Sequence, residues 1–151
     1  VGGSIYSRFG FSDVLTMFLA LNASVELYKG GIVPLAEYAQ RPYDRDILVR
    51  VIVPKEDAKF CYQSVRNSQT DFRKEHAGEY RFAIGARPGK AVLYTLPADA
   101  GETPELTSAR FAASIRSRIK TESNMRGSAE YRNHLAGVLV KRAVLKLEGN
   151  R

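Results

Sequence analysis

Cysteine is nearly absent from this sequence of 151 residues, which contains only Cys61 and no tryptophan. A single thiol excludes an internal disulfide, a four-thiolate iron–sulfur cluster and a cysteine-rich zinc site within the chain. Such sparse use of cysteine favours a reducing compartment, so we expect a cytoplasmic location. Because Cys61 falls in a predicted strand, we expect it to serve as a small apolar core residue rather than a reactive thiol.

Long apolar runs are also lacking. Charged residues interrupt each run well before the roughly 20 residues that a membrane-spanning helix needs, so we expect no membrane association. Hydrophobic residues make up 44% of the sequence and charged residues 26%, which is typical of a globular protein with a core of its own. The sequence begins with Val1 rather than methionine, from which we expect it to be part of a longer chain.

Residues with catalytic or metal-binding chemistry are scarce. The two histidines, His76 and His134, have no nucleophile at a recognisable spacing, and the carboxylates show no paired spacing typical of acid and base catalysis. No cluster has the spacing of metal ligands. We therefore expect no catalytic residue and no metal site in this chain, and we expect His134 on the surface of a helix.

Positive charge is confined to the end of the chain. Residues 1–109 carry equal numbers of basic and acidic side chains, so the net charge of +7 lies in residues 110–151. Such asymmetry is typical of solvated helix faces, of a surface for partner subunits, or of a nucleic-acid-binding module. In the last case the phosphate contacts would come from Arg116, Arg118, Lys120, Arg126 and Arg132. The lack of interleaved aromatic residues and of a recognition-helix motif weighs against nucleic acid.

The first third of the chain predicts short, mixed elements. The pair Gly2 and Gly3 favours a strand end or a tight turn with exposed backbone amides. Ser12 or Asp13 is predicted to cap a helix that ends near Asn22. Downstream we expect a hairpin with strands at 24–28 and 32–33, a helical turn at 34–38, an irregular loop at 41–45 and a strand at 47–53.

The polar residues 55–57 predict a boundary between two lobes. Beyond them, strands are expected at 60–65, 80–85 and 91–95. Thr103 is predicted to cap one helix and Ser128 a second. In the second helix, one apolar face is predicted to hold Tyr131, Leu135, Val138, Leu139 and Leu145, with Arg132 and Lys141 towards its edges. The second lobe is therefore predicted to be βββαα, and the fold class α+β.

One constellation near the start of the chain could bind a ligand. Backbone amides freed by glycine can approach a phosphate closely, so Gly2, Gly3 and Ser4 are candidates for an anion site. The carboxylate of Asp13 can accept a hydrogen bond from a ribityl or ribose hydroxyl. A β-turn followed by a capped helix would leave the same pattern without any ligand.

The motifs and their order resemble one family. Residues 1–5, followed by Ser12, Asp13, Val14 and Leu15, are similar to the second flavin motif of the FAD-binding (medium) subunit of molybdenum hydroxylases. This family includes xanthine dehydrogenase and carbon monoxide dehydrogenase. The similarity continues in order through residues 19–23, 25–27, 33–35, 46–48, 52–54, 68–72 and 126–132. The resemblance therefore covers nearly the whole chain.

The resemblance implies a fold and a cofactor site. Residues 1–56 would be the end of a PCMH-type FAD-binding lobe, and residues 57–151 the C-terminal lobe, an antiparallel sheet packed on helices. Asp13 would bond hydroxyl groups of FAD, and Tyr43 would either stack on the flavin or pack on the core as a loop aromatic. The implied cofactor-binding residues are Gly2, Gly3, Ser4, Ile5, Tyr6, Ser7, Ser12, Asp13, Pro42 and Tyr43.

The resemblance also implies a role in electron transfer. In this family, electrons pass from a molybdopterin cofactor through [2Fe–2S] clusters on partner chains or domains to FAD, and then to NAD or another acceptor. Two departures stand out. The family's first flavin motif is not in this sequence, and after Phe72 the chain continues as Arg73-Lys74-Glu75-His76 where the family enters an apolar strand. This predicts that an edge strand is lost or that a stretch of sequence is absent.

Overall fold

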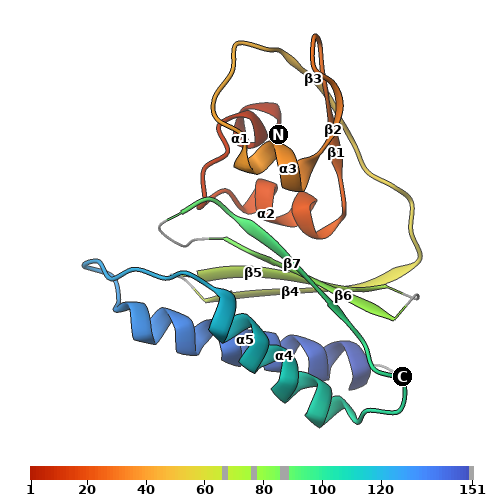
Figure 1. The fold of residues 1–151 in the computed structure, drawn as a ribbon, viewed down its shortest axis with the longest axis vertical. Helices are drawn as coiled ribbons and strands as arrows, with labels where there is room; N and C mark the ends of the chain where they lie inside the picture. Colours follow the sequence, from red (N-terminus) through yellow and green to blue (C-terminus); the bar gives the residue numbers. More distant parts are fainter. Residues whose placement is uncertain (66–67, 76–77, 86–88, 150–151) are drawn as a thin grey trace.

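The computed structural model describes residues 1–65, 68–75, 78–85 and 89–149, and it contains two antiparallel sheets (Figure 1). In the first sheet, β1 (Ser24–Leu27) lies between β2 (Gly31–Pro34) and β3 (Leu48–Ile52). Three short helices accompany it: α1 (Gly2–Tyr6), α2 (Asp13–Ala20) and α3 (Leu35–Gln40). The expected hairpin, helical turn and strand in this part of the chain are confirmed.

The second sheet has four strands in sequence order: β4 (Ala58–Val65), β5 (Ser68–Glu75), β6 (Glu79–Ile84) and β7 (Val92–Pro97). It is followed by two long helices, α4 (Pro104–Arg118) and α5 (Ala129–Gly149). The α+β class with an antiparallel sheet packed on helices is therefore confirmed.

The three predicted helix caps are confirmed, because each hydroxyl accepts a hydrogen bond from an amide of the first helical turn. Ser12 Oγ accepts from the Leu15 amide at 3.2 Å in α2, and Thr103 Oγ1 accepts from Leu106 at 3.4 Å in α4. Ser128 Oγ accepts from the Tyr131 amide at 3.1 Å in α5. These bonds satisfy amides that have no partner inside the helix.

The four-stranded sheet has helices on both faces. Figure 1 shows α4 and α5 below it and α2 directly above it, and α2 contacts β5, β6 and β7. Phe82, Phe111 and Leu139 belong to the core on the α4 and α5 side, which also contains Cys61, as predicted. The core around α2 draws Ala83 and Ala91 from the second half of the chain. The same sheet therefore contributes one face to each of two hydrophobic cores.

Glycine permits α2 to lie close to this sheet. A Cβ atom at Gly85, just after β6, would lie 2.4 Å from Thr16 Oγ1 and 3.1 Å from the carbonyl oxygen of Gly10. Thr16 cannot turn away cheaply, because it is buried and its hydroxyl donates to the Ser12 carbonyl at 3.0 Å. Any larger residue at Gly85 would separate the two layers.

The prediction of a strand end or turn at Gly2 and Gly3 is wrong, because both residues lie in α1. Helical bonds run from the Ile5 amide to the Val1 carbonyl at 3.1 Å and from the Ser7 amide to the Gly3 carbonyl at 3.0 Å. Glycine adopts several backbone conformations at little cost. The fully buried side chain of Ile5 selects the helical one, since it fills the core beside α2.

The strand count of the βββαα prediction needs correction, because β5 was missed. This strand lies in the interior of the sheet between β4 and β6. Its residue Phe72 is paired with Cys61 of β4 on one side and with Phe82 of β6 on the other. Residues 73–75, which follow Phe72, continue this strand, and the predicted loss of an edge strand or of a stretch of sequence stays a prediction. The histidine that follows, His76, lies outside the described residues. The division at residues 56 and 57 stays a prediction, although the two sheets fall on either side of it.

The predicted apolar face of α5 is correct only in part: Leu139 is buried and Leu135 packs against the core. Tyr131 is half exposed, while Arg132, expected at an edge, is buried and donates to Asn124 Oδ1 at 2.5 Å. Besides Leu139, the apolar residues buried on this helix are Ala136, Gly137, Val140, Ala143, Val144 and Leu147, none of which was predicted. At Gly137 the helix lies close to α4, because a Cβ atom there would lie 2.6 Å from Arg116 Cδ. His134 is exposed, as predicted.

Two findings concern the described ranges only. Within them, no helix combines the length and the apolar character needed to cross a bilayer. In that same part of the chain, no three histidine, cysteine or acidic residues are grouped so that they could hold a metal ion.

Candidate functional site

An open depression of about 490 Å³ lies where α1 meets the start of α2, and we call it the α1–α2 depression. Its lining contains Gly3, Ser4, Ser7, Phe9, Phe11, Ser12, Asp13 and Val14. Five of the ten predicted cofactor-binding residues are thus brought together on one surface.

The hydroxyl groups of the α1–α2 depression hold its two helices together. The Ser4 carbonyl accepts hydrogen bonds from Ser12 Oγ at 3.2 Å and from Ser7 Oγ at 3.4 Å. Ser12 Oγ also caps α2, so its donor and one of its acceptor sites serve the fold. This leaves Asp13, in the exposed first turn of α2, as the carboxylate best placed to accept a bond from a ligand.

The glycine pair leaves room for close approach of a ligand. A Cβ atom built on Gly2 or Gly3 would have no other atom within 4 Å, apart from its own chain neighbours and helix backbone. A phosphate or a sugar could therefore approach this backbone without displacing protein atoms. This chain presents the chemistry that the polar chain of a dinucleotide requires: glycine backbone, hydroxyls and one carboxylate.

The other predicted residues lie beside the α1–α2 depression rather than in its lining. Ile5 is fully buried in the core beneath it. The hydroxyl of Tyr6 donates to the Asp44 carbonyl at 2.8 Å, and that of Tyr43 donates to the Ser7 carbonyl. Tyr43 is 62% exposed, so its ring is not packed into the core. The carbonyl of Pro42 accepts from Arg8 at 2.5 Å.

The sequence analysis missed two aromatic residues of the lining, Phe9 and Phe11. Their rings stack with centroids 5.1 Å apart and planes at 10°. They remain 49% and 71% exposed, which is unusual for phenylalanine. Two aromatic residues that flank Gly10 in a predicted loop were the signal available in the sequence. Together with Val14 they give the depression an apolar part beside its serine hydroxyls and the carboxylate of Asp13.

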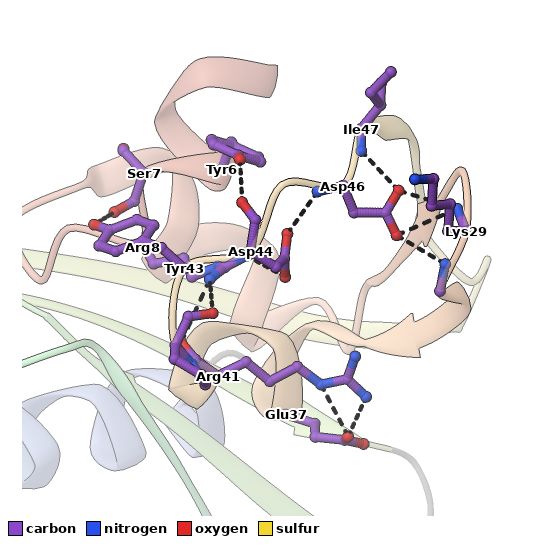
Figure 2. A network of polar contacts seen from close by, with 12 residues as sticks. Tyr6, Ser7, Arg8, Lys29, Glu37, Arg41, Tyr43, Asp44, Asp46 and Ile47 are labelled. Carbon is purple, nitrogen blue, oxygen red and sulfur yellow. Dashed lines mark hydrogen bonds and ion pairs between the residues drawn. The ribbon is translucent and has the colours of Figure 1, made fainter.

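Arg8 was missed as well, and it connects the site to a distant loop. Its side chain is buried, donating from Nη1 to the carbonyls of Pro42 at 2.5 Å and Arg41 at 3.4 Å. Nη2 forms an ion pair with Asp44 at 3.2 Å. Figure 2 shows Arg8 between the segment after α1 and the loop at residues 41–46.

Three tyrosines surround this guanidinium. The Arg8 Cζ atom lies 4.0 Å from the ring centroid of Tyr38, 5.3 Å from that of Tyr43 and 5.7 Å from that of Tyr6. We call Arg8, Asp44 and these three rings the Arg8 cage. Burial raises the pKa of Tyr38, and the positive charge of Arg8 partly counteracts this shift. A cation over aromatic faces is stabilised further when water is excluded.

Asp46 fixes the other end of the same loop to the hairpin of β1 and β2. Its carboxylate accepts from the amides of Gly30 at 2.8 Å, Ile47 at 2.8 Å and Lys29 at 3.0 Å. These amides, that of Lys29 first, hold the pKa of Asp46 below its ordinary value. The Asp46 carboxylate therefore stabilises the fold while it is ionised.

Asp46→Asn tests this arrangement through pH. A lowered pKa means that the stabilisation is present above the unfolded pKa of about 3.9 and is lost as the pH falls through the lower folded value. We expect Asp46→Asn to lower the urea midpoint at pH 7 and to have a smaller effect at pH 3. Equal effects at both pH values would contradict a role for the ionised carboxylate.

Part of the positive charge near the C-terminus is engaged within the chain. Arg110 pairs with Glu102 at 2.9 Å and with Asp99 at 3.1 Å, and its hydrogen bonds lower the pKa of Glu102. Arg116 Nε donates to Asn133 Oδ1 at 3.1 Å, and Arg118 lies over the ring of Tyr94. These contacts give several arginines a structural role in holding α4 to its neighbours.

Comparison with known proteins identifies the family. The profile described as the CO dehydrogenase flavoprotein C-terminal domain matches residues 68–147, more than half of the chain. The chain belongs to this family. The resemblance to the FAD subunits of molybdenum hydroxylases is thereby confirmed. No curated protein sequence matches the chain significantly.

The fold of this CO dehydrogenase flavoprotein family member is also similar to solved structures. Carbon monoxide dehydrogenase from Hydrogenophaga pseudoflava, in a form that lacks the Mo-pyranopterin moiety of its cofactor, has a TM-score of 0.83 at 19% identity. This match covers 98% of the chain and 60% of the matched chain in that structure. Reconstituted CO dehydrogenase from Oligotropha carboxidovorans has a TM-score of 0.79 at 20% identity, with 99% and 61% covered. Quinoline 2-oxidoreductase from Pseudomonas putida 86 has a TM-score of 0.75 at 18% identity, with 99% and 60% covered.

The chain therefore spans about 60% of the length of the structures that it matches. At these identities the likeness establishes the fold. The α1–α2 depression and the Arg8 cage lie before residue 68, outside the region that the family profile matches.

Proposed function

We propose that this chain binds FAD as part of the flavoprotein subunit of a molybdenum-containing oxidoreductase. The observation that carries the proposal is the α1–α2 depression, which gathers Gly3, Ser4, Ser7 and Asp13 on one open surface of a chain from a flavoprotein family. A binding surface for a sugar and phosphate chain needs this combination of accessible backbone and polar side chains.

The residues have different parts in the proposal. The open backbone at Gly2 and Gly3 would approach the diphosphate or ribityl chain, and Asp13 would accept from its hydroxyls. Ser4, Ser7 and Ser12 would shape the surface, while Ile5 and Tyr6 support it from the protein side. Pro42 and Tyr43 would border the cofactor from the neighbouring loop. The electron-transfer chemistry would come from the flavin, and this chain would hold, orient and shield it.

The proposal includes partners and an electron path. The chain has one cysteine, so [2Fe–2S] clusters would be held by other chains or domains, as would molybdopterin. NAD or another acceptor would take the electrons, and a cytoplasmic location accords with the single buried thiol. No specific observation favours the nucleic-acid alternative, since Arg116, Arg118 and Arg132 have contacts within the chain.

Gly3→Val tests the proposed cofactor surface. Because a Cβ at Gly3 would meet open space, we expect an unchanged melting temperature but FAD binding weakened about tenfold, or about 1.4 kcal/mol. The experiment is a titration of the apo form of the full-length natural protein with FAD, followed by flavin fluorescence. Gly149→Val is the matched control, because its Cβ also meets open space, at the end of α5.

Three outcomes are informative. Weaker binding by Gly3→Val alone would support the proposal. Equal FAD affinity of both variants and the natural protein would place the cofactor elsewhere. A full-length natural protein that takes up no FAD would overturn the proposed function as a whole.

A further inference from the structure

We propose that Arg8 is a positioning residue for the flavin: it holds the loop at residues 41–44 against the segment that lines the α1–α2 depression. This inference rests on the proposed function and deepens it. Arg8 itself is not among the residues that line the depression, but Ser7 and Phe9 on either side of it are. Its side chain extends to the neighbouring loop instead (Figure 2).

The acceptors of Arg8 all belong to that loop. They are two backbone carbonyls, of Arg41 and Pro42, and the carboxylate of Asp44. Only a planar guanidinium presents several donors in a fixed fork, so the three bonds determine where the loop lies relative to residues 7–9. A lysine could keep the charge but could not make the same set of bonds.

Tyrosine hydroxyls make further ties between the same two segments. The Tyr43 hydroxyl donates to the Ser7 carbonyl, and the Tyr6 hydroxyl donates to the Asp44 carbonyl at 2.8 Å. These rings also lie around the guanidinium, so the Arg8 cage joins the segments by cation–aromatic contact as well. The position of Tyr43, which the proposed function puts beside the flavin, therefore depends on Arg8.

Two energetically unfavourable features accompany the placement of the Arg8 side chain. Arg8 has a φ of +52°, in the left-handed region that favours glycine, although it follows the end of α1 where glycine is the common choice. Its Nε is also a buried donor without a hydrogen-bond partner. Backbone strain and unsatisfied buried groups concentrate at ligand clamps and active sites, where the surrounding structure maintains them. Such costs are unusual for a contact that serves stability alone.

The test uses Arg8→Met and Arg8→Lys in the full-length natural protein within its assembled complex. We expect Arg8→Met to raise the dissociation constant for FAD about tenfold. We also expect a change in the visible circular dichroism of the bound flavin, because the loop beside it moves. Arg8→Lys should restore part of the affinity but not the spectrum. Arg50→Met is the control, because this exposed arginine pairs with Glu26 and lies outside the loop that Arg8 holds.

The outcomes separate this inference from the proposed function. If Arg8→Met lowers only the melting temperature and leaves FAD affinity and the flavin spectrum as in the natural protein, Arg8 is structural and the inference is wrong, while FAD binding stands. If the natural protein binds no FAD, both fail. If Arg8→Met does not fold, the same FAD-affinity and flavin-spectrum measurements on Tyr43→Phe and Arg8→Lys test the inference instead. Weaker FAD binding and an altered flavin spectrum in both would support the inference, and natural values in both would overturn it.

Discussion

Asp44→Asn is expected to lower the free energy of unfolding by about 2–3 kcal/mol, because it leaves the buried Arg8 cation without its counter-charge. Breaking a fully buried pair costs about 3–5 kcal/mol, and the partial exposure of the Asp44 side chain reduces this value. Asparagine cannot restore the contacts. Its single amide oxygen can accept either from Arg8 or from the Asp46 amide, which now bonds to the second carboxylate oxygen at 3.1 Å.

Equilibrium unfolding in urea would measure this loss, and Glu37→Gln is its matched control. Glu37 also pairs with an arginine, Arg41, at 2.5 Å, but both side chains are well exposed. Exposed pairs of this kind contribute about 0–1 kcal/mol, so the control should change stability little. Similar losses in both variants would contradict the view that burial of Arg8 sets the value of its ion pair.

Phe111→Ala is expected to destabilise the protein by about 3–5 kcal/mol, the cost of removing a large, buried aromatic ring. Phe111 projects from α4 into the core, where it is fully buried. Its ring meets Tyr80 and Phe82 edge to face, with centroids 4.9 Å and 5.5 Å away. Both partners lie on β6, so the cavity would open at the contact between helix and sheet.

Leu106→Ala on the same helix is the control for this prediction. Leu106 is 60% exposed, and alanine has a high helix propensity, so we expect a change below about 1 kcal/mol. Urea unfolding of the two variants would compare them directly. A loss in Phe111→Ala no larger than that in Leu106→Ala would show that the core does not depend on this ring.

Elements with strong local signals could be predicted from the sequence. Thr103 and Ser128 were identified as caps, and Ser12 as one of two candidates with Asp13, because a capping side chain just before a helix is a local signal. The hairpin of β1 and β2 has a similar local signal in its paired glycines. Five lining residues of the α1–α2 depression were found for the same reason, since they lie within eleven residues of one another.

Features that depend on distant partners could not be predicted. Strand β5 has a largely polar sequence, and its hydrogen bonds with β4 and β6 place it in the interior of the sheet. The acceptors of Arg8 lie 33–36 residues away along the chain, so no spacing in the sequence relates them. The buried face of α5 includes Ala136, Gly137 and Ala143, and at Gly137 it depends on the close approach of α4, which no apolar stripe in the sequence indicates.

The sheet with helices on both faces affects how the protein folds. Because β6 lies in the wall of both hydrophobic cores, loss of the second sheet would also expose the inner face of α2 to water. Conversely, loss of α2 and the first sheet would expose Ala83 and Ala91 of the second half to water. The two halves thus share buried surface across β6 and its neighbours, which favours a single cooperative transition. The α1–α2 depression is thus supported, through α2, by a sheet whose other face is covered by α4 and α5.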